Sequence, residues 1–245
     1  MSQGLAILFL LLFLLLLIYA TIRVRAGHMP TLRQIRAFDT LKGLTGRSME
    51  AGRSLHLSLG IGSVVNNTTA DSLAGLSLLR YLAKQSTATG VPPIVSMADP
   101  TVMLYAQNVL GAAADTPDDA AEAYRHVRWM APQSSAYAAG VMNLINIEQT
   151  EGNVMLGNFG DEYLLIGETA AGSGTKYIGG TSDPNTLPFI YATAEEALLG
   201  EEIYAAGAYL EKQPAHIGSL IAQDTMRWLI FLFILAGILI ASLSG

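Results

Sequence analysis

The two longest apolar runs of the sequence lie at its ends. Residues 5–22 form an 18-residue run without a charged side chain, and residues 228–243 form a second run of 16 residues. As a helix the first run is about 27 Å long, close to the thickness of about 30 Å of a bilayer's hydrocarbon core. Trp228, at the start of the second run, is typical of an interfacial anchor. The pattern predicts transmembrane helices at residues 1–22 and 226–245.

The flanks of the first run are those of an uncleaved signal anchor. A cleaved signal peptide begins with a basic region, whereas the four residues before this run, MSQG, contain no basic side chain. Basic residues follow the run instead, at Arg23, Arg25, Arg33, Arg36 and Lys42. By the positive-inside rule we expect a double-pass protein of the inner membrane, with both termini outside and residues 23–227 in the cytoplasm. Cleavage of the first run is the alternative.

Between these runs, short apolar segments alternate with segments of helical periodicity. The predicted strands are 54–61, 93–97, 125–130, 153–157, 176–179 and 188–192. The predicted helices lie near residues 69–86, 100–114, 133–148, 162–171 and 194–212. This alternation predicts a Rossmann-like α/β domain with a mostly parallel sheet over residues 54–225.

Several helix starts carry capping signals. Asp99 and Thr116 each precede a proline, and proline is favoured at the first position of a helix. Thr193 is followed three residues later by Glu196, which predicts a capping box at the start of the last helix of the domain.

Two segments of the first half of the chain align with segments of the second half. Residues 50–63 align with 150–162 at an offset of 100, and residues 92–114 align with 187–209 at an offset of 95. The alignments suggest related halves at 31–114 and 132–212, arising either by duplication or by the similarity of any two βαβα units. In both cases two halves packed side by side create a crevice.

Charge divides the cytoplasmic part into a basic and an acidic region. Residues 23–53 hold seven basic and two acidic side chains, whereas residues 54–227 hold seven basic and eighteen acidic ones. Within the basic region an amphipathic helix is predicted, with apolar positions at Leu32, Ile35, Phe38, Leu41 and Leu44. This juxtamembrane helix is expected to pack on the domain, and binding to anionic lipid is the alternative.

Composition excludes several classes of protein. The chain is 51% hydrophobic and 14% charged and has a net charge of −6, which argues against a nucleic-acid partner. It contains no cysteine, so disulfides, Cys-ligated zinc, iron–sulfur clusters and cysteine nucleophiles are excluded. No cofactor is predicted.

The Gly-rich segment 60–72 follows a predicted strand and opens a predicted helix, as a phosphate-binding loop does. Gly60 and Gly62 match the first two glycines of G-x-G-x-x-G, but Val65 stands at the third position. A ligand in the crevice would meet residues from both halves: Gly60, Gly62, Ser63, Asn66, Asn67, Asp99, Gly157, Asn158, Gly160 and Asp161. Turn and capping chemistry is the alternative interpretation of the Asn and Thr cluster.

No catalytic or metal-binding motif is present. Gly174-Thr175-Lys176 has the wrong order for a P-loop, and no G-x-S-x-G occurs. The four histidines match no metal-ligand spacing, and His56 is interpreted as a hydrogen-bonded sheet histidine rather than a base. The sequence therefore predicts a protein that is not an enzyme and holds no metal.

The segment LRQIRAFDTLKGLTGRSMEAGRSLHLSLGIGS (32–63), together with two terminal spans around an α/β domain, resembles an uncharacterised family of prokaryotic membrane proteins of unknown function. The resemblance implies a membrane protein and supplies no activity, ligand or catalytic residue.

Two functions follow as expectations. The first is a non-enzymatic membrane scaffold or structural subunit that assembles as a homo-oligomer at the cytoplasmic face, possible partners being the lipid bilayer and other subunits of a membrane complex. Small-residue stretches such as 136–140 and 205–208 favour close packing in an interface. The second is a membrane-tethered sensor that binds a small anionic ligand or nucleotide between its halves.

Overall fold

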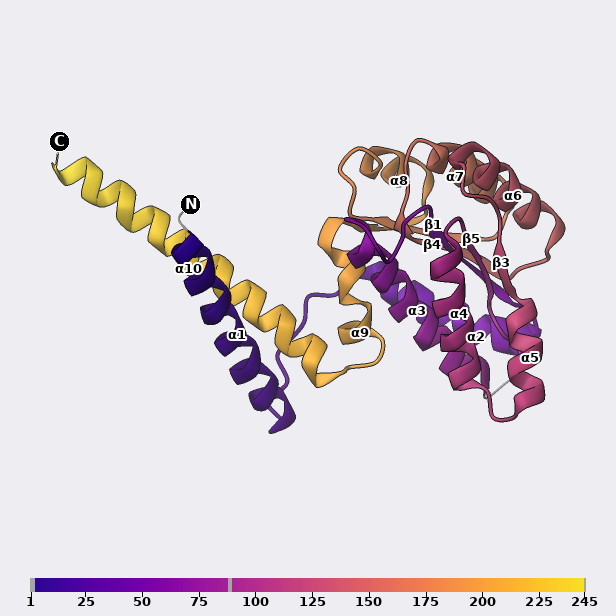
Figure 1. Ribbon diagram of the computed structural model, residues 1–245, viewed down its shortest axis with the longest axis horizontal. Coiled ribbons are helices and arrows are strands. Elements are labelled where there is room, and N and C mark those ends of the chain that lie inside the picture. The colour runs from indigo at the N-terminus through magenta and orange to yellow at the C-terminus, as the bar shows by residue number, and fades with distance from the viewer. Residues whose placement is uncertain (1–2, 88–89, 245) are drawn as a thin grey trace. The chain divides into compact units, whose positions relative to one another are not determined.

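A computed structural model gives the fold and describes residues 3–87 and 90–244. The chain divides into two compact units, each drawn in Figure 1. The first unit combines Met1–Arg33 with Glu211–Gly245, and the second is Gln34–Leu210. The first unit therefore contains the terminal helices and the second is an α/β domain.

The terminal unit consists of helices α1 (Gln3–Arg25) and α10 (Pro214–Ser244). Both are long and apolar enough to cross a membrane. Helix α10 begins at Pro214, before the apolar run at 228–243, and its first part contains the charged residues Asp224 and Arg227. At 1.5 Å per residue its 31 residues extend about 46 Å, which exceeds a hydrocarbon core of about 30 Å.

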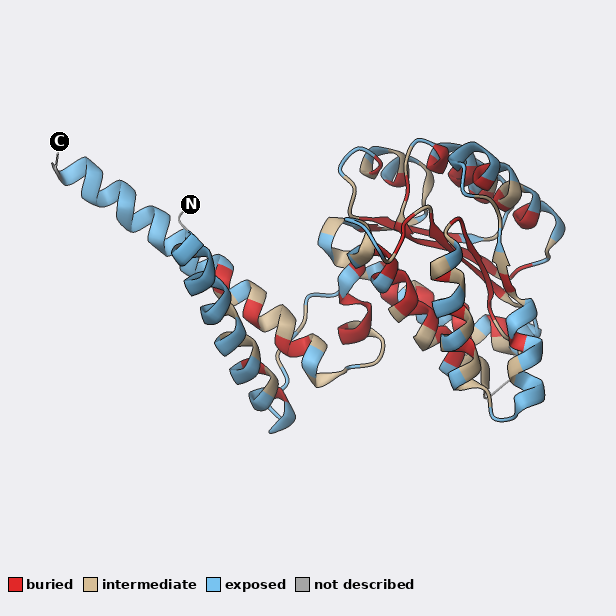
Figure 2. Ribbon diagram, in the orientation of Figure 1, coloured by how far each residue is buried: buried red, intermediate tan, exposed pale blue. Residues whose placement is uncertain are grey.

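The two helices pack over only part of their lengths. A Cβ added at Gly218 of α10 would lie 2.8 Å from the backbone nitrogen of Thr21, so only glycine permits this approach of the helices. The buried side chains Ala20 and Val24 come from the carboxyl-terminal half of α1. Residues 6–12 and 227–243 are exposed throughout, although nearly all of them are apolar (Figure 2).

The domain contains six strands and most of the helices. The strands are β1 (Leu55–Gly60), β2 (Ile94–Met97), β3 (Val127–Trp129), β4 (Gly152–Asn158), β5 (Lys176–Thr181) and β6 (Glu196–Leu199). The helices are α2 (Arg36–Ala51), α3 (Thr69–Thr87), α4 (Pro100–Ala113), α5 (Pro117–Arg125), α6 (Ser134–Ile147), α7 (Glu162–Gly172), α8 (Leu187–Thr193), the 3-10 helix η1 (Gly200–Ala205) and α9 (Ala206–Tyr209).

All strand pairs are parallel, and the strand order is β3-β2-β1-β4-β5-β6. This is the order of a Rossmann sheet, with β1 and β4 at its centre. The predicted fold class, an α/β domain with a mostly parallel sheet and apolar helices at both ends of the chain, is confirmed.

The sheet carries helices on both faces (Figure 1). Leu57, in the centre of β1, lies beside Val95 and Val154 and points to the face covered by α2, α3 and α4. The neighbouring residue His56 points to the face covered by α6, α7 and α8. Every residue of β1 is buried, so the centre of the sheet is covered on both faces.

Helix α2 packs on the domain with its apolar side. Its buried residues include Phe38, Leu41 and Leu44, and the Phe38 ring stacks on that of Tyr209 at a centroid distance of 5.1 Å. Leu32 and Ile35 precede the helix, which begins at Arg36. The domain-packed interpretation of the juxtamembrane helix is therefore the one that the contacts support.

Two element predictions are wrong near the end of the domain. Residues 188–192 form part of α8 rather than a strand, because Pro188 stands in the first turn of a helix. Residues 194–212 contain β6, η1 and α9 rather than one helix, since pairing with β5 outweighs the helix propensity of Glu196–Leu199. No capping box joins Thr193 to Glu196, because α8 ends at one residue and β6 begins at the other.

The two internal alignments fare differently. The alignment of 50–63 with 150–162 matches β1 to β4, the two central strands. The alignment of 92–114 with 187–209 is wrong, because it matches β2 to helix α8. In the sheet the topological counterpart of β2 is β5, the outer neighbour of β4.

Candidate functional site

The candidate site lies at the carboxyl edge of the sheet, where the strand order reverses between β1 and β4. The chain leaves β1 for α3 on one face and leaves β4 for α7 on the other. In parallel sheets this switch point is where ligands bind. The loop at 61–68 lies on one side of the switch point and the loop at 159–161 on the other. These two loops contain most of the predicted site residues.

The ends of β1 and β4 are in direct contact. The backbone N–H of Ile61 donates to the carbonyl oxygen of Asn158 at 2.9 Å. Gly60 has a φ of 78°, and a Cβ there would collide with that carbonyl group. A Cβ at Gly62 would lie 3.0 Å from the Cβ of Asn158. The structure thus brings together Gly60, Gly62 and Asn158, with Gly157 preceding Asn158 in β4.

The close approach expected of a third glycine is made by Gly75. A Cβ on Gly75, in the second turn of α3, would lie 2.6 Å from the carbonyl oxygen of Leu156 in β4. The mismatch of Val65 to the fingerprint therefore does not prevent a close approach of α3 to the sheet. The loop before α3 is longer than in the G-x-G-x-x-G pattern, so the glycine on the helix comes later in the sequence.

The loop at 61–68 is held by its own side chains. Ser63 N–H donates to Thr68 Oγ1 at 2.8 Å, and Thr68 N–H donates to Asn66 Oδ1 at 2.8 Å. Ser72 Oγ, on α3, donates to the carbonyl oxygen of Ser63 at 3.1 Å. Asn66 and Asn67 are exposed. Turn and capping chemistry accounts for Asn66. Within the described part of the chain, the exposed Asn67 side chain makes no hydrogen bond to the site.

Asp99 and Ser63 connect this loop to the end of β2. Asp99 Oδ1 accepts hydrogen bonds from the backbone N–H groups of Thr101 (2.7 Å) and Val102 (3.2 Å), which caps α4 as predicted. Burial tends to raise the pKa of the Asp99 carboxyl, but hydrogen bonds from Thr101, Val102 and Ser63 outweigh it and lower that pKa. Asp99 is thus an ionised cap at the switch point.

The β4–α7 loop turns one carboxylate inward and one outward. Glu162 is buried, and its Oε1 accepts a hydrogen bond of 2.8 Å from the backbone N–H of Gly160. Asp161 is exposed and caps no N–H with its side chain. Of these predicted residues, Gly160 belongs to the packed edge and Asp161 faces solvent.

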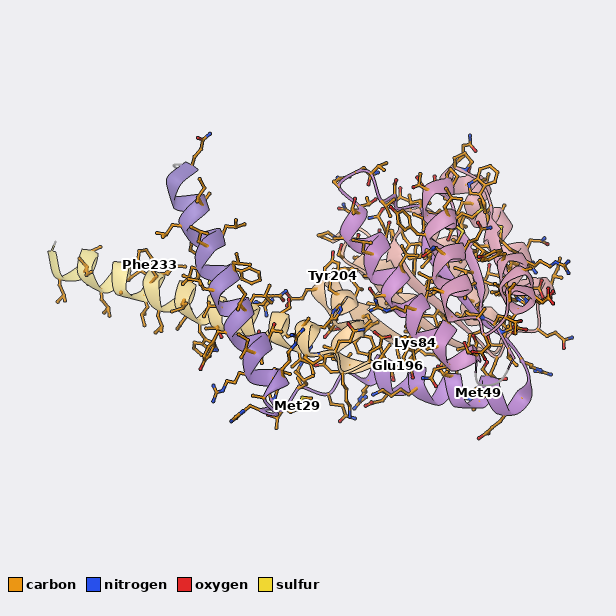
Figure 3. All side chains as sticks on the ribbon, turned by 60° about the horizontal axis from the view of Figure 1, so that its bottom comes forward. Met29, Met49, Lys84, Glu196, Tyr204 and Phe233 are labelled. Atoms are coloured by element: carbon orange, nitrogen blue, oxygen red, sulfur yellow. The ribbon has the colours of Figure 1, made fainter. Side chains whose placement is uncertain are left out.

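The centre of the edge is a buried carboxylate that the sequence did not single out. Asp71, in the first turn of α3, is only 5% exposed. Its Oδ1 accepts hydrogen bonds from Ser182 Oγ (2.7 Å) and Tyr204 OH (2.5 Å), and its Oδ2 accepts one from Asn158 Nδ2 (3.2 Å). Tyr204 is labelled in Figure 3. We call Asp71, Asn158, Ser182 and Tyr204 the Asp71 cluster.

The Asp71 cluster joins segments that are distant in the sequence. Asn158 ends β4, Ser182 follows β5, and Tyr204 belongs to η1 after β6. The N-terminus of a helix favours negative charge, which a bound phosphate supplies in nucleotide-binding folds. Here a carboxylate of the chain supplies negative charge at the start of α3. Burial and then the hydrogen bond to Asp71 raise the pKa of Tyr204, so the phenol stays a donor.

The whole edge is acidic. The connections at 61–68, 98–99, 130–133, 159–161, 182–186 and 200–205 contain no Lys or Arg. With the first turns of α3 and α7 they carry seven carboxylates: Asp71, Asp99, Asp161, Glu162, Asp183, Glu201 and Glu202. A bare phosphate would be repelled at this edge. Over the residues that the structure describes, no three His, Asp or Glu are grouped to hold a metal ion.

A buried polar chain lies beneath the switch point, on the face covered by α6 and α7. His56 Nδ1 lies 3.1 Å from Asn153 Oδ1, and His56 Nε2 lies 2.8 Å from Ser96 Oγ. Asn153 Nδ2 donates to Thr175 Oγ1 at 2.8 Å, so Asn153 Oδ1 is the acceptor for His56 Nδ1–H. His56 is thus a neutral imidazole that accepts from Ser96, and its interpretation as a hydrogen-bonded sheet histidine is confirmed.

This polar chain continues toward the carboxyl edge through Tyr137. The Tyr137 hydroxyl is hydrogen-bonded to Ser58 Oγ and accepts from the backbone N–H of Gly60 at 3.2 Å. Burial lowers the pKa of His56 to about 4 and raises that of Tyr137 to about 12. Both side chains are therefore uncharged at neutral pH, and their polar atoms are occupied by neighbours. Such a chain fixes the packing of the strands and has no free base to offer.

One comparison with known proteins identifies a family. The model of a family described as "Domain of unknown function (DUF6754)" matches residues 1–245. The chain belongs to the DUF6754 family. Neither the curated proteins nor the solved structures contain a match to this DUF6754 chain. The expected membership of an uncharacterised family is thereby confirmed, and the family description supplies no activity.

The site residues that sequence reasoning missed in this DUF6754 domain are Asp71, Glu162, Ser182 and Tyr204. Asp71 and Glu162 look like ordinary first-turn acids, which are favoured by the helix dipole wherever a helix starts. One signal was available: Ser182 lies three residues after the predicted strand at 176–179, and the carboxyl ends of parallel strands meet at one edge. The partnership with Tyr204 depends on η1, which was predicted as part of a longer helix.

Proposed function

We propose that this protein is a membrane-anchored, non-enzymatic scaffold or structural subunit of a prokaryotic inner membrane. In this proposal α1 is a retained signal anchor and α10 is a second span. Both termini lie outside, and residues 23–227 lie in the cytoplasm, where copies of the chain self-assemble alone or with other membrane-complex subunits. Nucleic acid has no part in it.

Membrane anchoring is supported by the terminal unit. Residues 6–12 and 227–243 expose apolar side chains along two helices that are long enough to cross a bilayer. Phe233, labelled in Figure 3, is 83% exposed and lies within this surface. Water is an unfavourable environment for such a surface, whereas lipid is a favourable one. The basic residues that follow the apolar run of α1 favour the cytoplasm for the domain.

The observation that carries a structural rather than a binding role is the Asp71 cluster. A Rossmann fold leaves the helix start after β1 open to a phosphate, but here a buried carboxylate with three donors fills that region. The surrounding loops add further negative charge and no basic group. His56, the most buried histidine, has both ring nitrogens hydrogen-bonded. These features favour a domain that maintains a shape over one that performs chemistry.

The test of the scaffold is the mass of the full chain in mild detergent and in lipid nanodiscs, measured over a dilution series. We expect a defined particle of two or more chains that persists on dilution. A strictly monomeric particle in both environments contradicts the proposal. Reporter fusions at residue 120 and at the C-terminus test the topology, and an external reporter at residue 120 contradicts it.

A second candidate is the membrane-tethered sensor, and the strand order favours it. The switch point between β1 and β4 carries Gly60 and Gly62, as in ligand-binding α/β folds. Because the edge is acidic, an anionic ligand or nucleotide requires an accompanying cation. The test is thermal unfolding with a nucleotide panel, with and without Mg²⁺. At a hundred times its dissociation constant a ligand stabilises by about 2.7 kcal/mol. An unchanged unfolding temperature across the panel removes this candidate.

A further inference from the structure

A groove of about 510 Å³ lies between the two helices of the terminal unit. Eight residues line it, all from α1 or α10: Leu17, Ile18, Thr21, Ile22, Arg25, Ala215, His216 and Ser219. The contact of Gly218 with Thr21 holds the helices together beside it. The groove is thus a feature of the helix pair and does not depend on the α/β domain.

The groove is chemically divided along its length. Its apolar wall comes from α1, with Leu17, Ile18 and Ile22. Its polar end contains Arg25, the last residue of α1, and His216, in the first turn of α10. Both groups therefore lie where the apolar run of α1 stops. In a membrane this is the level at which acyl chains give way to headgroups.

Arg25 is positioned for an external anion. Among the residues that the structure describes, neither Arg25 nor His216 forms an ion pair with a carboxylate. Guanidinium groups bind phosphate with two parallel hydrogen bonds, and imidazole adds a further donor. Basic pockets between membrane helices on the cytoplasmic side are known to hold anionic lipid headgroups.

We propose that this groove binds one anionic phospholipid, with its phosphate on Arg25 and His216 and an acyl chain along Leu17, Ile18 and Ile22. A lipid is favoured over free phosphate because most of the lining along α1 is apolar and offers nothing to a small hydrated anion. The inference rests on the membrane anchoring in the proposed function, and it is independent of self-assembly.

The test uses the full chain in nanodiscs made from an equal mixture of phosphatidylcholine and phosphatidylglycerol. After extraction into mild detergent, native mass spectrometry counts the lipids that each particle retains. We expect phosphatidylglycerol to be enriched over phosphatidylcholine. Arg25→Gln should reduce that enrichment about fivefold, which corresponds to the loss of one basic group at a membrane surface.

The matched control is Arg23→Gln, which removes the same charge from the same end of α1. Arg23 does not line the groove, so enrichment should be retained in this variant. Equal loss in the two variants would overturn the proposal in favour of general surface charge. Displacement of the lipid by inorganic phosphate alone would overturn it in favour of a small-anion site.

A second variant fills the groove from α10. Ser219→Phe places a ring in the groove without changing charge, and it should reduce retention of every phospholipid, with the helical content of the chain unchanged. Unchanged retention overturns the proposal. The particle mass from the same spectra separates the two proposals: lipid bound to a monomer supports the groove and contradicts the scaffold. Release of the chain from membranes by alkaline carbonate contradicts the anchoring on which both depend.

Discussion

The two faces of the central sheet are built from alternate residues of the same strands, yet they differ in chemistry. Toward α3, strand β1 presents Leu55, Leu57 and Leu59, all buried. Toward α6 and α7 it presents His56 and Ser58, which are also fully buried. Both faces are stabilised by removal of apolar surface from water, the second through a cluster that includes Val141, Met155 and Ile166. The second face also buries polar groups of β1, and these depend on every hydrogen bond being made.

The difference teaches that an alternating strand pattern does not identify a solvent-facing side. In β1 the sequence LHLSLG has the period of a half-exposed strand, but all six residues are buried. The polar positions are instead paired with one another across strands β2, β1 and β4. Apolar burial favours compactness without selecting one register, whereas this polar chain is satisfied in only one register.

The largest expected effect is on the apolar face. Leu57→Ala removes a side chain with no exposure at the centre of the sheet and should lower the free energy of unfolding by about 4 kcal/mol, through lost burial and a residual cavity. Chemical denaturation of the detergent-solubilised full chain measures it. Exposed Leu165→Ala, on α7, is the control and should change stability little. Equal losses in the two variants would contradict a tightly packed apolar face.

The next largest effect is a pH dependence of the free energy of unfolding that arises from His56 on the polar face. The folded-state pKa of His56 is about 4, below the ordinary value of 6.5, so between these values only the unfolded state binds the proton. The contribution of His56 to the free energy of unfolding is fully present above pH 6.5. The free energy of unfolding should fall by about 3 kcal/mol as the pH drops from 6.5 to 4. Denaturation at several pH values measures the slope. His56→Gln should lack this component, and an identical slope in the variant would contradict it.

Removing the central residue of the buried polar chain, with His56→Leu, should lower the free energy of unfolding by about 2 kcal/mol at neutral pH. His56→Leu leaves Asn153 Oδ1 without its donor and removes one hydrogen bond of Ser96 Oγ, and burying polar groups with missing hydrogen bonds is unfavourable. Replacing His56, Ser96 and Asn153 together with apolar residues should recover most of this loss of stability, because no polar group of the three is then left unpaired. Denaturation of both variants decides it. A triple variant less stable than His56→Leu would show that the buried polar chain adds to the free energy of unfolding and does not only select the strand register.

The smallest expected effect lies at the carboxyl edge. Asp71→Asn places an amide donor against groups that already donate, from Asn158, Ser182 and Tyr204, and should cost about 1.5 kcal/mol. Hydrogen exchange of η1 and of the start of α3 should increase in this variant. Asp161→Asn, at an exposed position on the same edge, should change neither measurement. Unchanged protection in Asp71→Asn would contradict the joining role of the cluster.

The fold could be predicted as far as local signals reach. The first five strands follow from apolar runs between helical segments, and Asp99-Pro100 fixes the start of α4. The prediction failed where pairing overrides propensity, at Glu196–Leu199, whose composition favours helix but which pairs with β5. At the candidate site, the glycines and Asn158 could be placed at the carboxyl edge because their positions after strands are local features. The Asp71 cluster was missed because its partners are separated by 87 to 133 residues.

The stacking of Phe38 on Tyr209 has a consequence for the order in which the domain is completed during synthesis. Helix α2 is the first element of the domain to leave the ribosome, but its aromatic partner is translated 171 residues later. Until then the apolar side of α2 lacks the ring that covers Phe38. Because Pro214 follows Tyr209 by only five residues, synthesis of the domain is completed just before synthesis of α10 begins. Helix α2, the first helix of the domain, is therefore among the last to complete its packing contacts.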